Sequence, residues 1–157
     1  MMEKFVDPVL EATRNVFVTM AQFEPRVGPM ELKTDTLARG DVTGLIGVEG
    51  GGVHGSLAIT FPKDVILDLM HRILSMDSTT IDEQALDLTG EISNMVLGGA
   101  KSLLEHQGYD LGLTLPKVLS GKDHNVNHLC QGTTLILPLF TPTSTFYVEV
   151  CFVEPQD

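Results

Sequence analysis

The sequence predicts an α+β fold in which helices and antiparallel strands occupy separate stretches of the chain. The first observation is that apolar residues recur at helical spacing in three stretches. The second is that the remaining stretches hold short apolar runs, bounded by glycine, proline and other turn-forming residues. Successive strands joined by short turns form antiparallel hairpins, and helices that stand outside the hairpins favour α+β over a doubly wound sheet.

The first half of the chain is predicted to fold as a helix, three strands and a second helix. These elements run, in order, from Asp7 to Pro25, over residues 30–36, 42–48 and 53–61, and from Pro62 onward. Asp7 and Pro8 have the residue types of a helix N-cap and a first helical position, and Pro62 opens the second helix in a similar way. Residues 50–52 are all glycine, which predicts a hairpin between the second and third strands.

The second half is predicted to follow the same order with a longer helix. The strongest helical run lies over residues 86–106 and ends near Gly108, because glycine commonly terminates a helix. Strands are then expected over residues 111–119, 133–140 and 145–153. This order resembles two pseudo-repeated units of one helix and three strands, a comparison carried by the pattern of elements rather than by sequence identity. No linker interrupts the chain, so residues 1–157 are predicted to form a single domain.

Composition restricts the partners and the compartment. The 157 residues, of which 43% are apolar, suffice for one domain with a proper core. A net charge of −11 argues against nucleic acid or an anionic membrane as the main partner and suits partners with basic side chains. The sequence shows no signal peptide and no apolar run of the about 18 residues that a membrane span needs, so we expect a cytoplasmic protein. In that compartment Cys130 and Cys151 are expected to be free thiols.

The candidate functional residues lie on one face of the long helix. Glu91 and Asn94 are three residues apart, so they project from the same face about 4.5 Å apart along the helix axis. Gly98 and Lys101 continue this stripe, and Asp87 borders it one turn earlier. A carboxylate and a carboxamide held this close can act together on a water molecule or a phosphoryl group. The alternative is that the stripe is only a solvated helix face.

The glycines of this helix require an explanation. Gly98 and Gly99 are adjacent in the helix interior, where each costs roughly 1 kcal/mol relative to alanine. They indicate close approach, either by another element of the fold or by a docked partner. The stripe predicted to be buried consists of Ile92, Met95, Val96, Leu103 and Leu104. The histidines predict no metal site, because His124 and His128 have no third ligand nearby.

These residues resemble the active helix of a known family. Asp87 together with the segment Gly-Glu-Ile-Ser-Asn-Met-Val-Leu-Gly-Gly-Ala-Lys over residues 90–101 is similar to that helix in the CheC/CheX/FliY chemotaxis phosphatases, and most similar to the CheX branch. The similarity continues through residues 40–61, Leu115-Pro116 and residues 146–150. It covers nearly the whole chain and implies a CheC-like fold with an antiparallel sheet and a long active helix.

The resemblance implies an enzyme that hydrolyses the aspartyl phosphate of a CheY-type response regulator in chemotaxis. Asn94 would orient a water molecule for attack on phosphorus, and Glu91 would pair with a lysine of the response regulator. Asp87, Gly98 and Lys101 would then contribute to partner binding. The resemblance also implies that this chain binds no metal or other cofactor, that Mg²⁺ belongs to the response regulator, and that the chain forms a homodimer.

Two other interpretations stay open, and the sequence departs from the family pattern in places. In the first, the helix belongs to a non-catalytic module that binds a response regulator or a flagellar-switch component. In the second, the chain is a dimeric scaffold in which Glu91 and Asn94 are only solvated. Some relatives carry a second motif in the first helix, but here Arg14 stands three residues after Glu11, so that site is expected to be absent. Pro116 follows Asn94 one residue earlier than is usual, and Gly99 replaces a common Asn.

Overall fold

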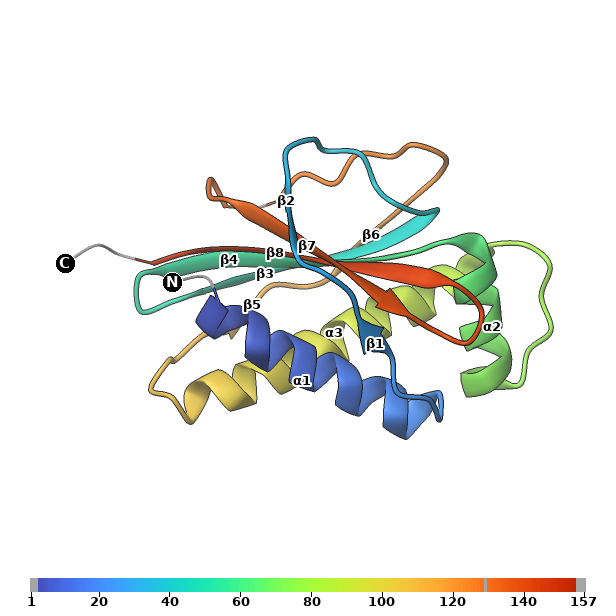
Figure 1. The fold of residues 1–157 in the computed structure, drawn as a ribbon, viewed down its shortest axis with the longest axis horizontal. Helices are drawn as coiled ribbons and strands as arrows, with labels where there is room; N and C mark the ends of the chain where they lie inside the picture. Colours follow the sequence, from blue (N-terminus) through green and yellow to red (C-terminus); the bar gives the residue numbers. More distant parts are fainter. Residues whose placement is uncertain (1–2, 129, 155–157) are drawn as a thin grey trace.

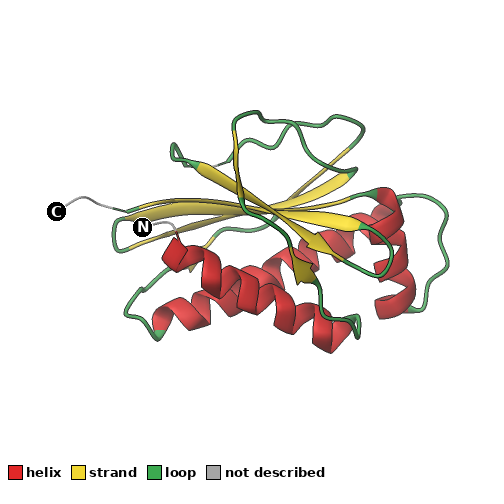
Figure 2. Cartoon of the chain, in the orientation of Figure 1, coloured by secondary structure: helices red, strands yellow, loops and turns green. Residues whose placement is uncertain are grey.

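Three helices lie against one face of an eight-stranded antiparallel sheet in the computed structural model, which describes residues 3–128 and 130–154 (Figure 1, Figure 2). The helices are α1 (Glu3–Met20), α2 (Lys63–Leu74) and α3 (Glu83–Glu105). The strands are β1 (Arg26–Val27), β2 (Glu31–Lys33), β3 (Val42–Gly50), β4 (Val53–Phe61), β5 (Gly112–Leu113), β6 (Lys117–Ser120), β7 (Thr134–Phe140) and β8 (Thr145–Val153). None of the described helices is long and apolar enough to cross a membrane. The predicted α+β fold is confirmed.

The sheet is built from two hairpins that meet at its centre. Its strand order is β1-β7-β8-β4-β3-β5, with β2 also paired to β7 and β6 also paired to β3. The β3–β4 and β7–β8 hairpins meet along the β4–β8 pair, and short strands flank each hairpin on its outer side. Because α1 precedes the first hairpin and α3 precedes the second, the two halves have the predicted pseudo-repeated order, with α2 between them.

Each half contributes four strands where three were predicted. In the first half, β1 was missed because its two residues are ordered by pairing with Leu139 and Phe140, which lie far along the chain. In the second half, the strand expected over residues 111–119 is divided into β5 and β6 by Pro116, which has no backbone N–H for the ladder. The predicted bounds of β4 and β8 are confirmed.

The start of α1 also differs from the prediction. The helix already includes Glu3, so Asp7 and Pro8 lie inside it instead of beginning it. Phe5 is 1% exposed and stacks on Phe152 of β8, with 4.4 Å between the ring centroids. Burial of this aromatic ring stabilises the helical turn ahead of the proline, so tertiary packing outweighs the local start signal.

The two faces of the sheet are covered differently. The main apolar core lies between the sheet and the helices, whereas loops cover the outer face (Figure 2). On the outer face Lys33 donates a hydrogen bond of 2.9 Å to Glu149, and His128 lies 3.0 Å from the other oxygen of that carboxylate. The side chains of Lys33 and Glu149 are at most 1% exposed, so this cluster is a buried, paired set of charges that ties β2 and the loop after β6 to β8.

The expectation of two free thiols is wrong, because a disulfide joins Cys130 to Cys151. Cys151 lies two residues after Glu149 on the outer face of β8, and the loop that carries Cys130 folds back over this face. The two residues are 21 positions apart in the sequence, so their contact depends on the course of that loop, for which no local pattern exists.

The last hairpin, formed by β7 and β8, is not an open edge of the sheet. Strand β8 is central, and the outer side of β7 is paired with β1 and β2. Large exposed apolar side chains at this end of the sheet lie instead on or beside the short strands, at Val27, Met30 and Leu32, which are 47%, 42% and 65% exposed.

Candidate active site

Helix α3 is held rigidly against the sheet. Asp82 caps its N-terminus by accepting a hydrogen bond of 3.1 Å from the backbone N–H of Ala85. The buried hydroxyl of Ser93 donates to the Thr89 carbonyl at 2.8 Å, and the absence of a side chain at Gly44 of β3 makes room for Ser93. The buried hydroxyl of Thr89 likewise donates to the Ala85 carbonyl, at 2.8 Å. Because both hydroxyls are paired, the helix can pack closely on the sheet and present a fixed outer face.

The prediction of a buried stripe on α3 is correct except at the edges of the stripe. Ile92, Val96 and Leu104 are at most 1% exposed, and Leu103 is half-buried. Met95 is 41% exposed, so the prediction for this residue is wrong. At about 100° per residue, Met95 is rotated away from Asn94 towards the side of the helix that faces α1, where the packing no longer covers it.

A groove of about 580 Å³ runs beside α3. One wall consists of helix residues and the other of the chain that enters β6; the lining residues are Leu86, Asp87, Gly90, Glu91, Asn94, Pro116 and Val118. Gly90 allows the two walls to approach, since a Cβ at this position would lie 3.2 Å from Cγ2 of Val118. Gly90 was not among the predicted site residues, although a glycine inside a helix is itself a signal of close packing.

The structure brings three of the predicted site residues together in this groove. Asp87, Glu91 and Asn94 are all exposed there. Within the described part of the chain, these three side chains make no hydrogen bond or ion pair. Their polar atoms are therefore available to water or to a partner.

Gly98 and Lys101 lie further along the same helix, outside the lining of the groove. The ideal Cβ of Gly98 would have no atom within 4 Å, whereas that of Gly99 would lie 3.1 Å from Cβ of Ala12 in α1. Packing between helices thus explains Gly99, and only Gly98 leaves open space on the outer face. Lys101 is paired with Glu105 at 2.6 Å, and this carboxylate raises the pKa of the lysine.

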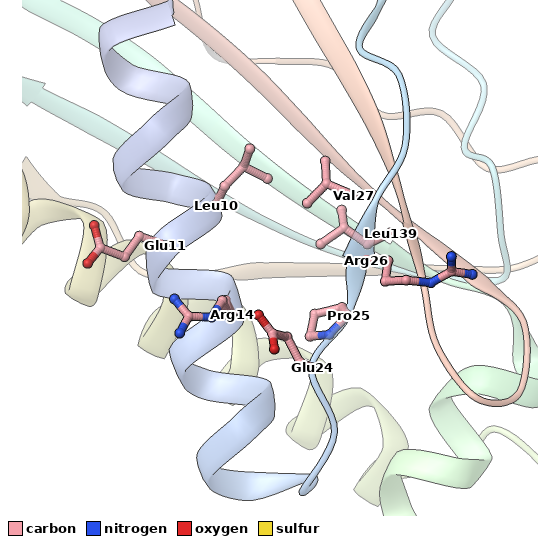
Figure 3. Close-up of a pocket in the computed structure, with 8 residues that line it drawn as sticks. All are labelled: Leu10, Glu11, Arg14, Glu24, Pro25, Arg26, Val27 and Leu139. Carbon is pink, nitrogen blue, oxygen red and sulfur yellow. Dashed lines mark ion pairs between the residues drawn. The ribbon is translucent and has the colours of Figure 1, made fainter.

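A second groove, of about 440 Å³, lies beside α1 (Figure 3). It is lined by Leu10, Glu11, Arg14, Glu24, Pro25, Arg26, Val27 and Leu139. The groove contains Glu11 and Arg14, which occupy the positions on α1 where some relatives carry a second motif and where this chain was predicted to have none. Arg14 stands where a carboxamide would be needed, and its Nε lies 2.8 Å from Oε1 of Glu24. The guanidinium is therefore engaged in an ion pair across the groove.

The groove beside α3 contains side chains suited to positioning a water molecule and pairing with a cation. A carboxamide both donates and accepts hydrogen bonds, so Asn94 can hold a water molecule without acting as a base. The carboxylate of Glu91 is free to pair with a cation. The described residues contain no group of three or more His, Cys, Asp or Glu side chains that could hold a metal ion.

Comparison with known proteins identifies similar chains. The family described as "Chemotaxis phosphatase CheX" matches residues 42–140. The CheY-P phosphatase CheX of Thermotoga maritima is 30% identical over 135 residues, which cover 85% of this chain and 83% of that protein. A CheC-like superfamily protein from Shewanella sp. PV-4 is 44% identical with a TM-score of 0.90, covering 98% of this chain and 99% of that one. The CheX-CheY-BeF3-Mg complex from Borrelia burgdorferi contains a chain with the same fold, 21% identical with a TM-score of 0.81, covering 96% of this chain and 98% of that one.

Proposed function

The chain belongs to the CheX family of chemotaxis phosphatases, and from this premise we propose that it hydrolyses the aspartyl phosphate of a CheY-type response regulator at the groove beside α3. The observation that carries the proposal is the exposure of Asp87, Glu91 and Asn94 in one groove, with no partner among the described residues. Three polar side chains that are held on a rigid helix and left unpaired are suited to a partner that brings the remaining groups.

Asn94 is the proposed catalytic residue. Hydrolysis of an acyl phosphate transfers the phosphoryl group to water and releases the aspartate carboxylate, so the protein must mainly position the water and balance charge. The amide oxygen of Asn94 accepts a hydrogen bond from this water and directs its lone pair at phosphorus. No general base is required from this chain, because the water's proton can pass to the phosphoryl oxygens.

Glu91 and the rest of the exposed face are proposed to fix the partner. The Glu91 carboxylate pairs with a lysine of the response regulator, and Asp87, Gly98 and Lys101 border the contact. We propose that Mg²⁺ is bound by the response regulator rather than by this chain. The Borrelia burgdorferi complex, which contains CheX, CheY, BeF3 and Mg²⁺, supports such an arrangement. The negative net charge favours association with a partner that presents basic side chains.

Compartment and assembly follow from the same proposal. The chain is expected to act in the cytoplasm, where response regulators are phosphorylated. We propose that it forms a homodimer and that the exposed apolar residues near β1 and β2, among them Leu32, take part in the contact.

The test is the decay of a phosphorylated CheY-type regulator with and without the protein. The wild-type chain should accelerate the decay, and Asn94→Ala should lose about 10²-fold or more of this acceleration while still binding the regulator activated with BeF3. Asn15→Ala, which removes an exposed asparagine from α1, is the matched control and should retain activity. Binding without any acceleration by the wild-type chain would point to a non-catalytic module instead.

A further inference from the structure

Leu115 is the most exposed large hydrophobic residue that the structure describes, at 89%. Single exposed apolar residues are common on protein surfaces and by themselves indicate nothing. Two features set Leu115 apart: the backbone that presents it is fixed, and it adjoins the groove that contains Asn94.

A β-bulge places Leu115 outside the sheet. Strand β5 pairs Leu113 with Val48 of β3, and β6 pairs Lys117 with Leu45 of the same strand. Three residues therefore separate Leu113 from Lys117 where β3 has only two, and the extra residue lies at Leu115-Pro116. Bulges of this kind redirect side chains and are enriched next to active sites.

The bulge is fixed on both sides of Leu115. The backbone N–H of Thr114 donates to the Gly47 carbonyl at 2.9 Å, and the Gly47 N–H donates to Oγ1 of Thr114 at 2.8 Å. On the other side, Pro116 restricts the residue before it to extended conformations. The leucine side chain is thus presented to solvent by a rigid backbone, and little backbone order remains to be gained when it meets a partner.

The position of Leu115 brings it within the contact area of any partner that uses the groove. Pro116 lines the groove opposite Asn94, and consecutive Cα atoms are about 3.8 Å apart. A partner face of about 800 Å² extends some 16 Å from its centre, so a protein that brings a phosphoryl group to Asn94 also covers Leu115. On the other side of the polar row, Met95 is 41% exposed and adds a second apolar side chain.

We propose that Leu115 is an apolar anchor for the response regulator, which it contacts on an apolar patch beside the phosphorylated aspartate. This inference rests on the proposed function. The occupant is the regulator rather than a second copy of this chain, because a copy seated on Leu115 would cover the groove and exclude the phosphoryl group from Asn94. Contact with a buried apolar anchor at the centre of an interface, inside a polar surround, is the usual source of binding energy between proteins.

The test measures the initial rate of dephosphorylation against the concentration of phosphorylated regulator. Leu115→Ser should raise KM by roughly five- to tenfold with kcat close to the wild-type value. Leu115→Met, which retains an apolar side chain, should restore KM. Leu37→Ser is the matched control, since Leu37 is 46% exposed between β2 and β3 and does not line the groove, and it should leave KM unchanged.

The outcomes separate this inference from the proposed function. An unchanged KM in Leu115→Ser, with Asn94→Ala inactive, would overturn the anchor and leave the phosphatase mechanism standing. Full activity in Asn94→Ala would instead overturn the mechanism. If Leu115→Ser changed the sedimentation of the free protein but not KM, the leucine would belong to a contact between copies of the chain, and the anchor would again be wrong.

Discussion

The grooves beside α3 and α1 have walls of the same kind, but they differ in the side chains that the helix presents to the groove. Each groove sets a helix carrying a glutamate, Glu91 or Glu11, against a segment with the sequence proline, basic residue, valine. That segment starts at Pro116 beside α3 and at Pro25 beside α1. The match supports the pseudo-repeated order of the fold at the level of individual residues.

The difference lies in a row of three positions spaced four residues apart. On α3 this row is Gly90, Asn94 and Gly98; on α1 the row in the same relation to the glutamate is Leu10, Arg14 and Val18. The α3 row has small side chains, and Gly98 has open space above it. The α1 row is filled, and its arginine is held by Glu24. The two grooves therefore differ in the access to the helix face, and this access distinguishes the candidate active site.

Placing the α1 residue in the α3 groove should remove most of the activity. Asn94→Arg should abolish the acceleration of regulator dephosphorylation, a loss of about 10²-fold or more, because a guanidinium cannot accept a hydrogen bond from the attacking water. Asn94→Arg should also weaken binding, because an arginine three residues after Glu91 can pair with that carboxylate, whereas Asn94→Ala should leave binding intact. Phosphate release and binding of the BeF3-activated regulator measure the two effects.

The reciprocal change on α1 tests whether access to the helix face decides the difference between the two grooves. In a chain that already carries Asn94→Ala, the further change Arg14→Asn should restore no activity, because Leu10 and Val18 still fill the row on α1. Recovery of dephosphorylation would mean that the groove beside α1 lacks only a carboxamide, and access along the helix would then not be the deciding difference.

A smaller effect is expected from closing the space at Gly98. Gly98→Val gives α3 the residue that α1 has at this place, and the added side chain should raise KM several-fold by meeting the docked regulator. The free energy of unfolding should rise by a few tenths of a kcal/mol, because valine is a better helix former than glycine. Urea unfolding and steady-state kinetics measure these two changes.

The matched variant on the other helix is Val18→Gly. It should leave KM unchanged and lower the free energy of unfolding by a similar amount. An unchanged KM in Gly98→Val would show that the partner does not approach α3 at this turn, and Gly98 would have to be removed from the proposed contact.

The elements that the sequence predicted well are those whose signals are local. Strands β4 and β8 are long apolar runs between turn residues, and their bounds agree with the prediction. The misses depend on contacts between distant segments. Strand β1 exists through pairing with β7, the start of α1 through stacking of Phe5 on Phe152, and the disulfide through the loop that returns to β8.

The candidate site divides in the same way. Helical spacing alone placed Asp87, Glu91 and Asn94 on one face, and the structure brings them together. Spacing could not place Pro116 and Val118 opposite them, because this wall comes from another element. Nor could it distinguish Gly98 from Gly99, since only the position of Ala12 in α1 shows that one is packed and the other open.

The smallest effect on activity is expected far from both grooves, at the disulfide on the outer face of the sheet. Breaking it with Cys130→Ser should change kcat and KM by less than about twofold, because the bond ties a loop to β8 and touches neither helix face. Stability should fall by about 3 kcal/mol, the entropy cost typical of a loop of this length. Reduction of the wild-type chain should give the same result. If activity fell with either treatment, the loop would be coupled through β6 to the wall formed by Pro116 and Val118, and the outer face would have to enter the comparison of the two grooves.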